Sequence, residues 1–223
     1  MTTHWPILDP LLPEQRRQVL AAGRRREFAR KEVVFHEGDP GDSLHLVQRG
    51  HVAVRITTPM GDVATLTVVG PGRTFGELAL LDPAARRSAT CVALERTETW
   101  SLHRDQVDRL RREHPAIDRF FLEMLATYVH RLSEHLVQAL YVPADRRVAL
   151  RLLDLVATYG LGRAIPLTQD DLASLAGTSR ATVNRLLGEL ETDRAVTVAR
   201  GRITVLDERP VRRRAGTAPP TAP

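Results

Sequence analysis

The stretch that most constrains this chain runs from Phe75 to Thr90 and reads FGELALLDPAARRSAT. Apolar, strand-like segments flank it at residues 64–69 and 90–94. A short loop between two strands gains little packing from an acid, arginines and a serine. This combination is typical of a segment that binds a polar ligand.

The side chains of this stretch have the chemistry of a sugar-phosphate site. Gly76 lets the backbone approach a ligand closely, and the first N–H groups of a short helix expected at Leu78–Leu81 can face an anion. The planar guanidinium of Arg87 can bind a phosphate. Ser88 adds a hydroxyl donor, and Glu77 can accept from a ribose hydroxyl. The alternative is a charged surface turn with an internal Glu77–Arg87 ion pair.

The stretch resembles the phosphate-binding cassette of the Crp/Fnr family of bacterial transcription factors. The resemblance rests on the Gly-Glu-Leu start at Gly76, the Arg-Ser-Ala end at Arg87, and the place of Arg87 ten residues after Glu77. It implies that Glu77 holds the ribose 2′-OH and that Arg87 and Ser88 hold the cyclic phosphate. The backbone of Gly76, Leu78 and Ala79 would assist.

Composition narrows the class of protein further. The chain has 223 residues and 43% hydrophobic residues, enough for one large or two modest domains, and no apolar run approaches the ~18 residues of a membrane span. The start lacks the pattern of a signal peptide, so we expect a cytoplasmic protein. Cys91 is the single cysteine. It permits neither an internal disulfide nor a cysteine-ligated iron–sulfur cluster within one chain.

Positive charge is concentrated toward the C-terminus. Residues 145–214 hold 13 arginines and nine acids, a net of +4 out of +5 for the whole chain. This bias favours a polyanionic partner there. Lys31 is the only lysine, so the whole chain uses arginine in place of lysine. The number of arginines alone is therefore weak evidence for a polyanionic partner.

The first half of the chain predicts a helix followed by an antiparallel roll. Residues 9–22 have helical apolar spacing and end before the Arg24–Arg26 run, which we interpret as a solvated helix end. From Phe28 to Leu102, short alternating segments are separated by glycine-containing turns, the pattern of an antiparallel barrel or roll. The glycines fall where the cyclic-nucleotide-binding roll of the family has its turns. His36, His45 and His51 match no standard metal-ligand spacing, so we predict no metal site.

Residues 114–142 predict a long helix that pairs two subunits. Apolar residues follow a heptad track with one polar member, which favours a parallel homodimer over packing on the chain's own roll alone. The track comprises Phe121, Leu125, Tyr128, Leu132, His135, Ala139 and Val142.

This helix also departs from the family pattern. The resemblance places Leu132 and Ser133 where the cAMP-binding members contact adenine with a hydroxyl pair, and Tyr128 where they have an arginine near the ribose-binding acid. The effector expected first is cAMP, bound by the cassette together with Leu132 and Ser133. A different cyclic nucleotide, or a vestigial pocket, remains an alternative.

The C-terminal third predicts a winged helix-turn-helix. Thr168 and Asp171 form a capping-box pattern, Gly177 supplies the turn, and Ser179 or Thr178 caps the second helix. Arg180 and Arg185 can pair with guanine, Asn184 can pair with adenine, and Ser179 and Thr182 can donate to phosphates. Ala181 stands where the family usually has a glutamate, so we expect an altered or relaxed half-site. The predicted DNA-binding residues are Thr168, Ser179, Arg180, Ala181, Thr182, Asn184, Arg185, Arg200 and Arg202.

Arg200 and Arg202 flank a hairpin turn that would form the wing. The basic segment 209–223, with its alanine- and proline-rich end, is predicted to be disordered.

The sequence therefore predicts an α+β protein of two domains. Its expected parts are an antiparallel β-roll with an N-terminal helix (1–113), a dimerisation helix (114–142), a winged helix-turn-helix (143–208) and the tail (209–223). The expected function is a cyclic-nucleotide-controlled homodimer that binds a near-palindromic DNA site, with RNA polymerase as a further partner. An enzyme such as a nucleotide hydrolase is the weaker alternative, because we find no paired carboxylates, metal cluster or nucleophile–base pair in the sequence.

Overall fold

The computed structural model describes residues 3–81 and 86–217. They form two compact units. The first is drawn from Met1–Thr57 and Val69–Leu132, and the second from Thr58–Val68 and Ser133–Pro223. The second unit thus takes in a short hairpin segment from the middle of the predicted roll.

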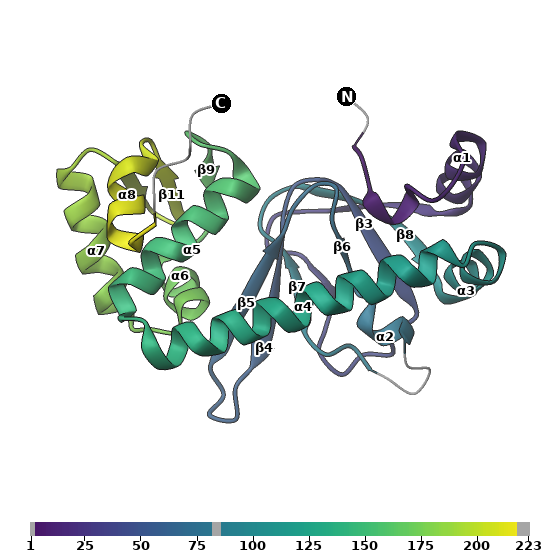
Figure 1. Ribbon diagram of the computed structural model, residues 1–223, viewed down its shortest axis with the longest axis horizontal. Helices are drawn as coiled ribbons and strands as arrows, with labels where there is room; N and C mark the ends of the chain where they lie inside the picture. Colours follow the sequence, from purple (N-terminus) through teal and green to yellow (C-terminus); the bar gives the residue numbers. More distant parts are fainter. Residues whose placement is uncertain (1–2, 82–85, 218–223) are drawn as a thin grey trace. The chain divides into compact units, whose positions relative to one another are not determined.

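The strands of the predicted roll form two four-stranded antiparallel sheets (Figure 1). One sheet has the order β1-β8-β3-β6 and the other β2-β7-β4-β5. The bounds are β1 Arg24–Phe28, β2 Val33–Phe35, β3 Ser43–Arg49, β4 Val52–Thr57, β5 Val63–Val69, β6 Thr74–Phe75, β7 Thr90–Ala93 and β8 Thr97–His103.

One strand was missed by the sequence patterns. The Arg24–Arg26 run does not end the first helix but opens β1, the edge strand that pairs with β8. Four of the five β1 residues are exposed and only Phe28 is buried, so the strand lacks the apolar alternation that would have revealed it. The helix itself, α1, covers Pro13–Ala22 after a 3-10 turn at Pro6–Leu8.

Helices close the roll with an apolar core. After α1, the helices of this part of the chain are the four-residue α2 (Leu78–Leu81), α3 (Arg104–Glu113) and α4 (Ala116–Tyr141). One buried cluster joins the N-terminal segment, β3, β8, α3 and the start of α4: Trp5, Ile7, Leu8, Leu11, Val19, Leu44, Leu46, Leu80, Leu102, Val107, Ile117 and Phe121.

Helix α4 carries two apolar tracks. Phe121 is only 3% exposed and packs in the core of the first unit, and Tyr128 is half-buried. These two residues of the predicted heptad track therefore do not face outward. The exposed large apolar side chains of α4 are Leu122, Val129, Leu132, Leu136, Val137, Leu140 and Tyr141. Leu132 is thus an exposed member of the predicted track. Four other exposed side chains lie one position after a predicted track residue: Leu122, Val129, Leu136 and Leu140.

The second unit contains the predicted helix-turn-helix and wing. Its sheet has the order β10-β11-β9. The bounds are α5 Ala144–Tyr159, β9 Ala164–Ile165, α6 Gln169–Ala176, α7 Arg180–Thr192, β10 Val196–Ala199, β11 Arg202–Val205 and α8 Glu208–Ala215.

Helix α8 corrects the predicted tail. Residues 209–215, predicted to be disordered, are helical, with Val211 and Ala215 fully buried against their surroundings. Asp207 caps the helix through the N–H of Arg209 at 2.9 Å, and α8 packs on α5. The sequence patterns missed this helix because four arginines outnumber its three buried residues, Pro210, Val211 and Ala215. Residues 218–223 lie outside the described residues.

Within residues 3–81 and 86–217, no helix combines the length and hydropathy of a membrane span.

Candidate functional site

The predicted cassette begins where β6 leaves the sheet. Phe75 pairs with His45 of β3, and Gly76 follows with φ +87°, a left-handed conformation that favours glycine. A Cβ on Gly76 would lie 2.7 Å from Nη1 of Arg87 and 3.0 Å from the carbonyl oxygen of Ser43. Glycine is therefore required here because the guanidinium of Arg87 passes directly beside the backbone.

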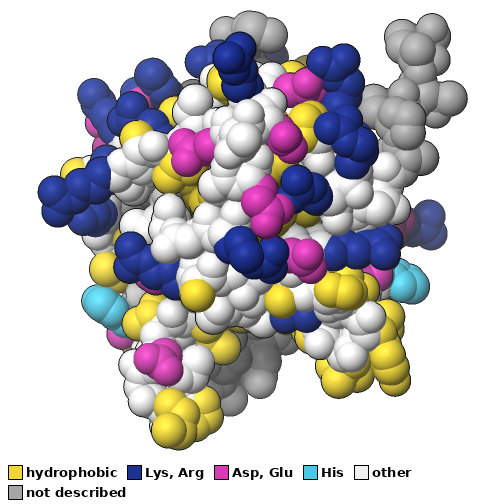
Figure 2. Space-filling view, turned by 90° about the vertical axis from the view of Figure 1, so that its left-hand side faces the viewer, with side chains coloured by type: hydrophobic (Ala, Val, Ile, Leu, Met, Phe, Trp, Pro, Cys, Tyr) yellow, Lys and Arg dark blue, Asp and Glu magenta, His cyan; other side chains and the backbone are white. Residues whose placement is uncertain are grey.

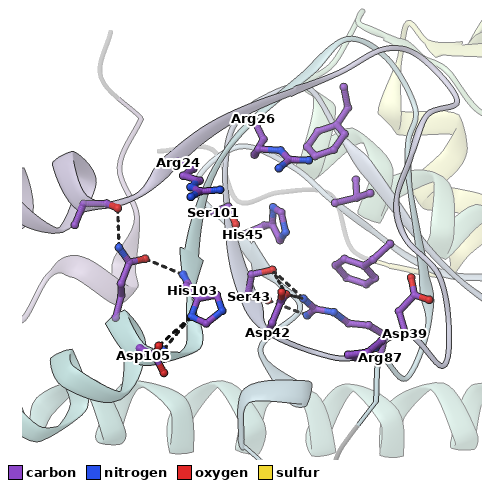
Figure 3. A pocket seen from close by; sticks show the side chains of 16 residues that line it. Arg24, Arg26, Asp39, Asp42, Ser43, His45, Arg87, Ser101, His103 and Asp105 are labelled. Atoms are coloured by element: carbon purple, nitrogen blue, oxygen red, sulfur yellow. Dashed lines mark hydrogen bonds and ion pairs between the residues drawn. The ribbon is translucent and has the colours of Figure 1, made fainter.

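Arg87 is buried and held by the protein itself (Figure 3). Its Nη1 donates to the carbonyl oxygens of Gly76 and Ser43, both at 2.8 Å, and its Nη2 donates to the Ser43 hydroxyl at 3.0 Å. Nη2 also lies 3.4 Å from Oδ1 of Asp42, and the guanidinium carbon lies 4.1 Å from the centroid of Phe35. Burial lowers the pKa of Arg87 and the nearby Asp42 raises it.

The third guanidinium nitrogen of Arg87, Nε, differs from the two terminal nitrogens. Among the described residues, its buried Nε has no hydrogen-bond partner. The main chain of Arg87 is fixed, because its N–H donates to the carbonyl of Asp39 at 2.8 Å and its carbonyl accepts from Gly38 at 2.8 Å. The side chain of Arg87 could therefore rotate to bind a phosphate while its backbone stays in place.

Glu77 is buried beside this arginine, with 5% of its surface exposed. Burial raises the pKa of its carboxyl, and hydrogen bonds from its own backbone and from Tyr128, together with the charge of Arg87, act in the opposite direction. Oε2 of Glu77 has no partner among the described residues. A buried acceptor without a donor is costly, so this oxygen is suited to a hydroxyl group of a ligand.

The other predicted cassette residues differ in exposure. Ala79 is buried, whereas Leu78 and Ser88 are exposed. Residues 82–85, between the short helix α2 and Arg87, lie outside the described residues. Leu132 and Ser133 are both exposed on α4, whereas Glu77 and Arg87 are buried and Tyr128 is half-buried.

Sequence reasoning did not assign a site role to three residues that shape the cassette. Asp42 and Ser43 hold the Arg87 guanidinium. Arg104 donates to the carbonyls of Gly41 at 2.8 Å and Leu80 at 3.1 Å, fixing the end of α2. No spacing rule would have found them, because they lie 17 to 45 positions from Glu77 and Arg87 in the sequence, Asp42 directly before β3, Ser43 at its start and Arg104 at the start of α3.

The second unit presents the predicted helix-turn-helix. Thr168 caps α6: its hydroxyl accepts from the N–H of Asp171 at 3.1 Å, and the Asp171 carboxylate accepts from the N–H of Thr168 at 2.9 Å. Gly177 ends α6 with φ +57°, and the hydroxyl of Ser179 accepts from the N–H of Thr182 at 3.3 Å to start α7. Of the two predicted caps, Ser179 is the one used.

The outer side of α7 is polar. Val183, Leu186, Leu187 and Leu190 are buried, whereas Arg180, Ala181, Asn184 and Arg185 are exposed. Arg180 lies 3.2 Å from Asp170, and Arg185 lies 3.3 Å from Glu189. Exposed pairs of this kind are weak, so both guanidiniums can turn to another partner at little cost.

The wing is the β10–β11 hairpin with its turn at Arg200–Gly201, and Arg200 and Arg202 are exposed on it. Figure 2 looks onto the side on which α7 and α8 lie and shows arginine side chains spread over that face, with acidic ones among them. The face has many guanidiniums but is not uniformly basic.

Arg147 of α5 supports the turn between α6 and α7. Its Nε donates to the carbonyl of Ala176 at 2.8 Å and its Nη2 to that of Gly177 at 2.7 Å, while Nη1 donates to Val142 at 2.7 Å. One guanidinium thus joins the residue that follows the long helix to the turn between α6 and α7.

Comparison with known proteins agrees with both halves of the structure. Residues 25–114 match the cyclic nucleotide-binding domain, and residues 146–214 match the Crp-like helix-turn-helix domain. The "Cyclic AMP receptor protein" of Thermus thermophilus is 36% identical over 200 residues, covering 90% of this chain and 92% of the relative. The chain belongs to the Crp/Fnr family.

Two further relatives support this placement in the Crp/Fnr family. The "CRP-like cAMP-activated global transcriptional regulator" of Mycobacterium tuberculosis is 34% identical over 169 residues, covering 73% of this chain and 75% of the relative. The crystal structure of the Thermus thermophilus catabolite activator protein matches with a TM-score of 0.56 and 34% identity, covering 96% of this chain and 100% of that one. The chain is thus a cyclic-nucleotide-binding, DNA-binding transcription regulator of the Crp/Fnr family with the two-domain fold expected from its sequence.

Proposed function

We propose that this Crp/Fnr regulator binds cAMP in the cassette and, as a homodimer, uses that ligand to control binding to a near-palindromic DNA site. The observation that carries the proposal is the pair of buried groups at the cassette. Arg87 has a spare Nε donor and Glu77 has a spare Oε2 acceptor within the same buried group. A cyclic nucleotide supplies the complementary phosphate oxygens and ribose hydroxyl.

Glu77 would accept from the ribose 2′-OH, and Arg87 would pair with the cyclic phosphate together with Ser88. The backbone of Gly76, Leu78 and Ala79 would line the same ligand. The names of the Thermus and Mycobacterium relatives, which refer to cAMP, favour this nucleotide. Leu132 and Ser133 are exposed on α4, so they would meet the base from across a dimer interface.

The dimer would form through α4. Its exposed apolar track includes Leu122, Leu132, Leu136 and Leu140, at 59–70% exposure each. Leucines in such a row are costly to leave in water and are suited to a parallel partner helix. Two recognition helices held by this dimer would read half-sites about 34 Å apart.

On the DNA, Arg180, Asn184 and Arg185 would contact base edges with Ala181 between them. Thr168, Ser179 and Thr182 would donate to phosphates, as would Arg200 and Arg202 on the wing. Contact with RNA polymerase and a cytoplasmic location complete the proposal.

The test is isothermal titration of the purified protein with cAMP, cGMP and cyclic di-GMP. We expect saturable micromolar binding of cAMP that is lost in Arg87→Ala, with a parallel gain in affinity for an operator DNA. Intact recovery of the nucleotide after incubation separates a regulator from a hydrolase. Absence of heat and of thermal stabilisation with all three nucleotides would overturn the allosteric part.

A second function is a DNA-binding regulator whose pocket takes no cyclic nucleotide. It is favoured by the contacts that already occupy both terminal nitrogens of Arg87. Equal DNA affinity with and without each nucleotide would support this alternative.

A further inference from the structure

A cavity of about 620 Å³ opens between the edge strand β1 and the loop that leads into β3 (Figure 3). Its volume lies within the ~300–1,000 Å³ typical of small-molecule sites. Three arginines line it: Arg24 and Arg26 from β1, and Arg87 from the cassette. Glu77, Ser88 and Tyr128 do not line it. It is therefore a separate space that shares with the proposed nucleotide site only Arg87 and the two residues that hold it, Asp42 and Ser43.

The two β1 arginines are unpaired cations. They are two residues apart on a strand and so point to the same side of the sheet. In the part of the chain that the structure describes, neither makes a salt bridge, and Arg26 only lies 6.0 Å from the Phe28 ring. Their neighbour Arg25, on the other side of β1, is paired with Glu98 at 2.7 Å. The contrast shows that the cavity side of β1 keeps its charge available.

The floor of the cavity is neutral and aromatic. His45 is buried, stacked on Phe75 with 4.9 Å between ring centroids, and its Nδ1 lies 3.2 Å from the hydroxyl of Thr99. Burial, followed by the charges of Arg87 and Arg26, lowers the pKa of His45 to about 3. The imidazole therefore stays uncharged, and the guanidiniums provide the positive charge. Phe28 and Phe35 give the ligand an apolar wall.

Acids and hydroxyls at the cavity limit the kind of anion. Asp39, Asp42 and Asp105 line it with Ser43 and Ser101. Three carboxylates disfavour a polyanion such as nucleic acid, but they can accept from the hydroxyls of a small ligand. The lining thus fits one compact oxyanion attached to a hydroxylated body.

We propose that this cavity binds a small phosphate ester of a hydroxylated compound, such as a sugar phosphate, with its phosphate on Arg24 and Arg26. Arg87 is the connection to the cassette. A phosphate that draws Arg87 into the cavity removes it from the nucleotide site, and linkage makes the two affinities depend on each other.

The test is isothermal titration of the full chain with glucose 6-phosphate, ribose 5-phosphate and inorganic phosphate at about physiological ionic strength. The variant is Arg24→Ala/Arg26→Ala. The matched control is Arg30→Ala/Arg49→Ala, which removes two exposed arginines outside the cavity. We expect one site per chain for a sugar phosphate, weakened more than tenfold in the first variant and unchanged in the control, with weaker binding of inorganic phosphate.

Glu77→Gln separates this proposal from the cassette. Sugar-phosphate binding should persist in that variant whether or not the cassette binds cAMP. Equal loss in both arginine double variants, or loss in Glu77→Gln, would overturn the assignment to this cavity. Absence of saturable binding to all three compounds at millimolar concentration would also overturn the proposal.

Discussion

The phenol of Tyr128 donates a hydrogen bond to the buried carboxyl of Glu77. Burial raises the pKa of Tyr128, and the charge and hydrogen bond of Glu77 raise it further. The long helix therefore contacts the proposed ribose-binding acid through a neutral donor. An arginine at this place would add a second positive charge beside Glu77, whereas a phenol leaves Arg87 as the cation whose charge lowers the pKa of that carboxyl.

We expect Glu77→Gln to stabilise the unliganded protein at high pH. The folded-state pKa of Glu77 lies above its ordinary value of 4.5, so folding becomes less favourable as pH rises from that value through the folded pKa. A neutral amide avoids this loss, by about 1–3 kcal/mol for a poorly satisfied buried group. That corresponds to about 2–4 °C in Tm per kcal/mol.

The measurement is thermal unfolding of Glu77→Gln and wild type at pH 4.5 and pH 8. The stabilising difference should be present at pH 8 and absent at pH 4.5. Glu113→Gln, at an exposed position on α3, is the control and should show no pH-dependent difference. A lower Tm for Glu77→Gln at pH 8 would contradict the prediction.

Asp42→Asn should strengthen cyclic-nucleotide binding. Asp42 is 66% exposed at its side chain and lies 3.4 Å from Nη2 of Arg87, where it competes with a phosphate. Because the Asp42 carboxylate of this pair is exposed to water, we expect the pair to contribute only about 0.2–1 kcal/mol, so titration should show up to about fivefold tighter binding. The Glu113→Gln control should bind as wild type does, and weaker binding by Asp42→Asn would show that Asp42 positions Arg87 instead.

Leu136→Glu should shift the proposed dimer toward monomer. Leu136 is 59% exposed on α4, and burying a leucine contributes about 1.5–3 kcal/mol, a gain that a charged residue reverses in both subunits. Size-exclusion chromatography with light scattering gives the mass. Met60→Glu, at a residue 88% exposed outside α4, should leave the mass unchanged; an unaltered mass for Leu136→Glu would place the interface elsewhere.

Arg147→Ala should destabilise the DNA-binding unit. The variant leaves the carbonyls of Val142, Ala176 and Gly177 without their donor. A hydrogen bond to a charged group contributes about 1.5–3 kcal/mol to stability, and water molecules that bond to the freed carbonyls recover part of this. We expect a net loss of about 2–4 kcal/mol by thermal unfolding. Arg147→Lys should recover part of it, since an ammonium can reach one carbonyl at a time. Equal stability of Arg147→Ala and wild type would refute this role.

Ala181→Glu should change the preferred half-site of the proposed DNA complex. The methyl group of Ala181 is exposed beside Arg180 on α7, and a glutamate there could accept from cytosine N4. Selection from a random operator library should show a shift toward cytosine at one position, worth about 1–3 kcal/mol. Thr197→Glu, at an exposed site on β10, is the control, and identical selected sequences for all three proteins would remove Ala181 from the interface.

The sequence predicted those features that depend on local patterns. The cap at Thr168, the turn at Gly177 and the short helix after Glu77 all follow from neighbouring residues, and the structure confirms them. Features that depend on distant contacts were not predictable in this way. Asp42 reaches Arg87 only because β3 begins beside β6, and Arg147 meets Gly177 only through helix packing.

Two errors have a common cause. The arginine-rich strand β1 and the arginine-rich helix α8 were interpreted as a helix end and a disordered tail, since charged residues outnumber apolar ones in both. In each case a single buried side, at Phe28 or at Val211 and Ala215, anchors the element. The heptad track of α4 was wrong at Phe121 and Tyr128 for a different reason. This helix has apolar residues on two adjacent sides, so the sequence alone does not show which side is exposed.

Helix α8 also sets an order of events during synthesis. The first unit ends at Leu132, whereas the core of the second contains Val211 and Ala215. At the ~5–20 residues per second of translation, the ligand-binding roll is complete several seconds before the DNA-binding unit can close. A chain released before α8 is synthesised would therefore have a folded first unit and an incompletely folded second unit.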